Sequence, residues 1–148
     1  MNATDTFHKH YSSSLEASRS VASDIVPFWQ QLELDSVLIA QMELCLVEWV
    51  NNVFEHAYEN LDGAKFEIRS YLTDTKQLSI EISDYGQAMP SDTLSNLPNI
   101  DFVEPLENAP STWLQSNRGL KIIQHIADSL EYNSHNNRNT FRLLKKTN

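Results

Sequence analysis

The most constraining feature of this sequence is a long apolar run at helical spacing between residues 36 and 58. Apolar side chains recur there every three or four positions, which predicts a helix with one continuous buried face. Asp35 or Ser36 can cap its first turn, and the turn residues from Asn60 to Gly63 end it. The buried face is expected to contain Leu38, Met42, Cys45, Leu46, Trp49, Val50, Val53, Phe54 and Ala57.

Two further helices are predicted from the same spacing. Ser13 to Glu16 has the Ser-x-x-Glu pattern of a capping box, and Pro27 is expected to kink the helix that follows or to end it near Val26. Asn117 can cap a later helix over residues 118–130. The inner faces of these helices would hold Leu15, Ser18, Val21, Ala22, Ile25, Phe28, Trp29 and Leu32 in the first, and Leu120, Ile123, Ile126, Ala127 and Leu130 in the second.

Alternating apolar and polar residues predict one hairpin in the middle of the chain, and a second hairpin near the C-terminus and a short strand near the N-terminus are also expected. The expected strands are residues 7–12, 64–72, 77–84, 130–134 and 138–145. Helices and antiparallel strands in this order indicate an α+β fold, a two-layer α/β sandwich in which helices cover one face of a mixed, mostly antiparallel sheet.

Length and composition restrict the class of protein. A chain of 148 residues predicts a single domain, 1–148, and its net charge of −9 argues against a nucleic-acid binder. The single cysteine, Cys45, favours a reducing compartment. No signal peptide is recognisable and no window approaches the ~18 apolar residues of a membrane span, so a cytoplasmic location without membrane contact is expected.

Three polar side chains form a stripe on the helix predicted over residues 36–58. Glu48, Asn52 and His56 lie at i, i+4 and i+8, beside an apolar stripe that contains Trp49 and Val53. A carboxylate and a carboxamide one turn apart can hold a hard cation, and the carboxylate can also act as a general base. The alternative is a polar stripe that faces solvent.

Two glycine motifs are also candidates for a ligand site. Asp84 and Gly86 follow a strand, where a glycine lets the backbone approach a ligand and an aspartate can accept from an amino group such as that of adenine. The alternative is a plain turn. The segment from Ser116 to Leu120 places Gly119 at a helix N-terminus, where free N–H groups suit a phosphate, or where the residues serve only as a cap.

Other potentially reactive residues favour structural roles. His8 and His10 are spaced like metal ligands, but no companion cluster with metal spacing is found, so surface histidines are expected. Cys45, among Leu44, Leu46 and Val47, is expected to be a core residue and not a nucleophile.

Taken together, the three motifs resemble those of the anti-sigma-factor serine/threonine kinases of bacterial partner switching. These kinases share the Bergerat ATP-binding fold with gyrase B, Hsp90 and histidine kinases. The segment Val47–Tyr58 resembles the first box of the family, Asp84-x-Gly86 the second, and Arg118-Gly119-Leu120 the third. The resemblance extends over residues 10–146 and makes residues 86–117 the ATP lid.

The resemblance assigns roles to these residues. It implies that Asn52 binds Mg²⁺ and the phosphates of ATP, that Glu48 is the catalytic base, and that Asp84 accepts a hydrogen bond from the adenine amino group. The remaining nucleotide contacts that it implies are His56, Gly86, Ala88, Arg118, Gly119, Leu120 and Thr140.

The resemblance also implies a function, with alternatives. The chain would bind ATP and Mg²⁺, phosphorylate a serine on a STAS-domain anti-anti-sigma protein, sequester a sigma factor or similar regulator, and form a homodimer. Ala88 stands where the family has a glycine, and the third box is poor in glycine. These departures favour an alternative, a binding module of the same fold that acts only by sequestration. A histidine-kinase-like ATPase is the third hypothesis.

Overall fold

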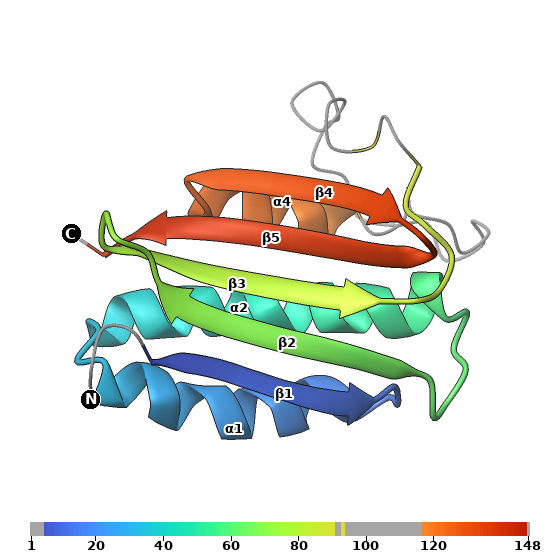
Figure 1. The fold of residues 1–148 in the computed structure, drawn as a ribbon, viewed down its shortest axis with the longest axis horizontal. Coiled ribbons are helices and arrows are strands. Elements are labelled where there is room, and N and C mark those ends of the chain that lie inside the picture. The colour runs from blue at the N-terminus through green and yellow to red at the C-terminus, as the bar shows by residue number, and fades with distance from the viewer. Residues whose placement is uncertain (1–4, 91–92, 94–116, 148) are drawn as a thin grey trace.

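The protein is an open sheet with its helices packed on one face (Figure 1). The computed structural model describes residues 5–90, 93 and 117–147. Most of the expected lid, residues 86–117, therefore lies outside the described residues. The elements, in chain order, are β1 (Thr6–Ser12), α1 (Ala17–Gln31), α2 (Ser36–Asn52), η1 (Val53–Ala57), β2 (Lys65–Leu72), β3 (Gln77–Asp84), α4 (Asn117–Ile126), β4 (Ser129–His135) and β5 (Arg138–Lys146).

The sheet has five strands in the order β1-β2-β3-β5-β4. All four pairings are antiparallel, so the α+β sandwich is confirmed and the mixed part of the prediction does not occur among the described strands. The last strand of the chain, β5, lies between β3 and β4, and β1 and β4 form the two edges. Both expected hairpins and the first strand are present.

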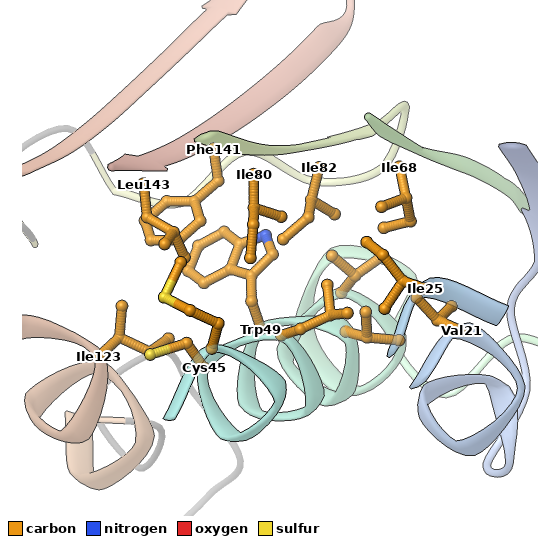
Figure 2. Close-up of a cluster of buried hydrophobic side chains, with 14 of the residues drawn as sticks. Val21, Ile25, Cys45, Trp49, Ile68, Ile80, Ile82, Ile123, Phe141 and Leu143 are labelled. Carbon is orange, nitrogen blue, oxygen red and sulfur yellow. The ribbon is translucent and has the colours of Figure 1, made fainter. Parts of the chain in front are cut away.

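The core lies between the sheet and the helices (Figure 2). Trp49 of α2 stacks on Phe141 of β5, with ring centroids 3.8 Å apart, and this contact joins the two layers at their centre. The Cys45 side chain is fully buried, as expected of a core residue. Burying aromatic pairs of this kind is among the larger stabilising contributions in a small domain.

The N-terminus of α1 differs from the prediction. The Ser13 hydroxyl donates to Leu61 O and accepts from Ala64 N, so it ties the start of the chain to the turn before β2. It therefore does not form the expected capping box, and α1 begins at Ala17 without a side-chain cap. Leu15, which was expected on the inner face, precedes the helix and is 76% exposed.

Two helix ends also differ from the prediction. Helix α1 continues through Pro27 to Gln31, because Pro27 lies on the exposed side, where water can meet the carbonyl group that loses its N–H partner. Helix α4 ends at Ile126, four residues before the expected end, because the chain from Ser129 joins the sheet as β4. Leu130 consequently reaches the core from a strand.

The helix formed by α2 and η1 is unusually apolar. It has 22 residues, Ser36–Ala57, and an 18-residue stretch within it has a mean hydropathy of 1.3, so by length and composition it could cross a membrane. The prediction that no window approaches a membrane span is therefore wrong. In the structure, 56% of this apolar stretch is buried inside the protein, as in the core helix of a two-layer fold.

Candidate functional site

The polar stripe of the first motif lies where α2 passes into a π-helical turn. Each step of four residues in an α-helix rotates the side chain by about 40°, so a regular helix would carry His56 away from Glu48. After Asn52 the chain forms η1, in which Tyr58 N donates to Val53 O at 3.0 Å. A π-helical turn contains more residues, which returns His56 toward the line of Glu48 and Asn52.

The second motif is packed against the end of η1. Gln87 N donates to Ala57 O at 2.7 Å, and a Cβ atom at Gly86 would collide with that same carbonyl group. The requirement for glycine at this position is therefore steric. The Asp84 carboxylate is buried at the end of β3, and its Oδ1 atom accepts from Gly86 N at 3.0 Å and from Asn139 Nδ2 at 2.8 Å.

The third motif approaches the first. Helix α4 packs against α2, and a Cβ atom at Gly119 would lie 2.6 Å from Glu48 Oε2. The carboxylate group of Glu48 therefore lies against the backbone of the first turn of α4, where N–H groups have no partner within the helix. Three segments far apart in the sequence thus meet around the C-terminal end of α2.

Burial and charge shift the pKa values of several groups in this region. Burial and the nearby Glu48 carboxylate both raise the pKa of Glu55. Burial lowers the pKa of His56, which favours its neutral form. Burial raises the pKa of Asp84, although the hydrogen bonds from Asn139 and Gly86 act in the opposite direction. A concentration of carboxylates at the end of α2 is an environment that favours a cation.

Some of the residues predicted for the site lie elsewhere. Thr140 bonds to Ser83, 3.0 Å between the hydroxyl oxygens, on the sheet face opposite Asp84. The β5 residue paired with Asp84 is Asn139, which the sequence analysis missed because a one-residue step along a strand reverses the face. Leu120 is fully buried in the core, so that only its backbone could contact a ligand.

Two other predicted site residues are Ala88 and Arg118. Ala88 is exposed and does not have a positive φ angle, so the methyl group there causes none of the backbone strain expected of a lost glycine. Arg118 belongs to α4, but its side chain lies outside the described part of the structure. The arginine of the third motif therefore remains a prediction.

The residues present fit a nucleotide with its metal ion. Among the described residues, Asn52 Nδ2 is buried and has no hydrogen-bond partner. An unpaired buried amide costs about 1–3 kcal/mol, and a phosphate oxygen would satisfy it, while the Oδ1 atom of the same side chain is a suitable ligand for Mg²⁺. Both hydrogen bonds that Asp84 accepts from described residues go to Oδ1, which leaves Oδ2 for an amino group.

Comparison with protein families settles the family. The profile described as "Histidine kinase-like ATPase domain" matches residues 11–145. The chain belongs to this family. Membership of this ATPase family implies that the domain binds ATP, and the five-stranded sheet with helices on one face agrees with the family. No significant match is found among curated protein sequences.

Several solved bacterial structures have the same fold. The structure of the RsbU and RsbW domains of Rv1364c from Mycobacterium tuberculosis matches with a TM-score of 0.67 and 16% identity, over 97% of this chain and 32% of that one. The chain thus spans about a third of that protein. The SiaB-SiaC complex from Pseudomonas aeruginosa matches with a TM-score of 0.59 and 10% identity, over 93% and 88%.

A light-regulated enzyme has the same fold. The blue-light activated histidine kinase of Erythrobacter litoralis EL346 matches with a TM-score of 0.55 and 17% identity, over 77% of this chain and 32% of that one. These three likenesses concern the fold. They agree with the family that the profile match gives.

Proposed function

We propose that the chain is an ATP-dependent protein serine kinase of a bacterial partner-switching system. The observation that carries this proposal is the position of the Glu48 carboxylate, against the first turn of α4 and one helical turn from the unpaired amide of Asn52. A carboxylate beside a phosphate-binding helix N-terminus is suitably placed to act on the hydroxyl group that attacks the phosphate.

Each residue of the site has a separate part in this proposal. Asn52 would hold Mg²⁺ and the phosphates, and the backbone around Gly119 would meet the phosphate oxygens. Asp84 would accept from the adenine amino group through Oδ2, with Asn139 and Gly86 fixing the carboxylate. Mg²⁺, when bound, would neutralise the charge that develops on the transferred phosphoryl group.

The proposed reaction transfers the γ-phosphoryl group to a serine hydroxyl. The serine oxygen forms a bond to the γ-phosphorus as the bond to the β-phosphate oxygen breaks, so that phosphoserine and ADP are produced. Glu48 would accept the hydroxyl proton and would orient the oxygen for attack. Positioning and charge neutralisation supply most of the rate in this class of reaction.

The proposed substrate is a STAS-domain anti-anti-sigma protein. The motifs of the chain support this choice, because they resemble those of the anti-sigma-factor kinases, and the RsbU–RsbW and SiaB-SiaC structures share its fold. Phosphorylation adds about −1.5 to −2 charges to a docking face, and a partner of net charge −9 would repel that face. The proposal also includes sequestration of a sigma factor or similar regulator and a cytoplasmic location. The chain would form a homodimer, which sedimentation velocity would test.

Calorimetric titration with ATP and ADP, with and without Mg²⁺, tests the site. Micromolar binding by the wild type and its loss in Asn52→Ala and Asp84→Asn are expected, and Thr140→Ala should bind normally because Thr140 lies on the opposite face. Glu48→Gln should still bind ATP and should lose phosphoryl transfer to a STAS-domain protein. Full activity of Glu48→Gln would remove that residue from the mechanism.

The same titration distinguishes the alternative of a binding module without chemistry. The glycine-poor third box is the feature that favours this alternative. Tight binding of a partner protein by a chain that binds no nucleotide at millimolar concentration would support it, and would exclude the kinase.

A further inference from the structure

A second cluster of potential ligands lies on the face of the sheet that the helices leave uncovered. His8 and His10 are two residues apart on the edge strand β1, so both side chains point to the same face. In the antiparallel register His10 lies opposite Glu67 of β2, and His8 is its diagonal neighbour. The pairing of β1 with β2 therefore supplies the companion residue that the sequence spacing did not reveal.

The ligand atoms of these three side chains converge. His8 Nε2 lies 2.7 Å from Glu67 Oε2, and His10 Nε2 lies 3.4 Å from the same oxygen. The three ligand atoms all lie within 4.8 Å of one another. Two imidazole nitrogens therefore face a single carboxylate oxygen.

The carboxylate group is fixed from its other side. The Glu67 side chain is 8% exposed, and the Arg138 guanidinium donates to Glu67 Oε1. Arg138 also donates to Ser83 Oγ at 3.3 Å, which holds it in place. A ligand carboxylate that is oriented by a hydrogen bond to its second oxygen is a usual feature of metal sites.

We propose that His8, His10 and Glu67 form a binding site for a divalent transition-metal ion of the Zn²⁺ class. Two imidazoles and one carboxylate are a donor set that Zn²⁺ accepts, with the fourth position left to water. Nitrogen ligands favour such ions over Mg²⁺ and Ca²⁺, which prefer oxygen.

The side chains can adopt the geometry of such an ion without movement of the sheet. Bonds of about 2.0–2.1 Å in a tetrahedron require ligand atoms roughly 3.3–3.5 Å apart, so the His8–Glu67 contact has to lengthen slightly. The side chains of His8 and His10 are 45% and 67% exposed, which leaves both rings free to rotate. Each ring would then carry its proton on Nδ1 and present Nε2 to the metal.

The proposed site is separate from the nucleotide site. Arg138 and Asn139 are neighbours on β5 but point to opposite faces, the first to Glu67 and the second to Asp84. The cluster therefore lies across the sheet from Asp84, and this proposal does not depend on the kinase proposal. The net charge of −9 raises the local concentration of cations around the protein.

Titration of the nucleotide-free protein with ZnCl₂ tests the proposal, with thermal unfolding as a second readout. The wild type should bind Zn²⁺ at micromolar concentration, and its unfolding midpoint should rise because the ion joins β1 to β2. His8→Ala and His10→Ala should each weaken this binding at least tenfold and should remove the rise. His125→Ala is the matched control, since this exposed histidine belongs to α4.

Two results would overturn the site. One is a wild-type protein that shows neither heat of binding nor a change in midpoint with 100 µM ZnCl₂. The other is a His8→Ala/His10→Ala double variant that binds as many Zn²⁺ ions, as tightly, as the wild type, because the ion would then be held elsewhere. MgCl₂ at the same concentration should give no signal in any of these proteins.

Discussion

At the scale of single residues, two glycines show how the same substitution can have opposite consequences. Gly86 faces the backbone carbonyl of Ala57, whereas Gly119 faces the carboxylate end of the Glu48 side chain. A backbone group at the end of a packed helix cannot give way, but the end of a long side chain can rotate. The two positions therefore separate the stability of the fold from the geometry of the site.

We predict that Gly86→Ala destabilises the protein by about 1–3 kcal/mol, the usual cost of overpacking. Gly119→Ala should leave the stability unchanged or raise it by up to about 1 kcal/mol, because alanine favours the helix. By displacing Glu48, Gly119→Ala should lower phosphoryl transfer by roughly 100-fold. Urea unfolding and a transfer assay measure the two effects. Equal stability losses in both variants would contradict this account.

Asp84 offers a prediction about pH. Burial raises its pKa above the usual 3.8 in the folded protein, so the folded state holds the proton more tightly than the unfolded chain. The stability that this group contributes is therefore fully present below pH 3.8 and is lost as the pH rises through the raised pKa. In Asp84→Asn this loss is absent, although the amide oxygen can still accept from Asn139.

The free energy of unfolding of Asp84→Asn, relative to that of the wild type, should thus increase between pH 4 and pH 7. The variant should also bind nucleotide at least tenfold more weakly than the wild type. Denaturant unfolding at several pH values measures the first effect. Asp74→Asn, at an exposed turn position, is the matched control substitution. A difference that shrinks with rising pH would mean that Asp84 is stabilised in its ionised form.

The sequence identified the chemistry of single residues better than their partners. Glu48, Asn52 and Asp84 could be found because each lies in a local motif, and Gly119 because it opens a helix. Asn139 and Glu67 could not, because each is brought to its partner by strand register across 55 and 59 residues. Which face a strand residue takes depends on a register that no local pattern records.

At the scale of elements, the capping of α2 is the clearest local determinant. Asp35 accepts from Val37 N at 3.0 Å and from Leu38 N at 3.3 Å, whereas α1 has no side-chain cap. Two N–H groups at the start of the central helix depend on this one carboxylate.

Asp35→Ala should lower the free energy of unfolding by about 1 kcal/mol, because those two N–H groups lose their acceptor. Asp35→Asn should restore most of the loss, since an amide oxygen caps equally well. The shift in urea midpoint measures both. If the alanine and asparagine variants were equally unstable, the negative charge and not the cap would be responsible.

Most of the elements were predictable, and the errors have physical causes. Every described strand was expected, and periodicity indicated the central hairpin and the three long helical segments, because the two-layer core imposes one apolar face on each. Helix ends were less predictable. Ser13 bonds to the turn before β2 instead of capping α1, and Ser129 begins β4 instead of continuing α4. In both cases a tertiary contact replaced the expected local structure.

At the scale of the whole molecule, nucleotide binding and unfolding should be linked. A ligand that binds only the folded state at 100 times its Kd adds about 2.7 kcal/mol to the stability. For a chain of this length that corresponds to a rise of about 5–10 °C in the unfolding midpoint. MgATP should cause this rise in the wild type and not in Asn52→Ala, as measured by scanning fluorimetry. An equal rise in Asn52→Ala would place the nucleotide elsewhere.

The strand order has a consequence for how the protein is made. A chain that leaves the ribosome from its N-terminus presents β1, β2 and β3 first, and β4 follows with no described strand to join until β5 arrives. Because β5 lies between β3 and β4, the backbone groups on one edge of β3 have no strand to pair with until β5, which ends at Lys146, has emerged. A nascent chain that stalls before Arg138 would therefore lack β5 and have an open sheet, prone to aggregation and suited to capture by chaperones.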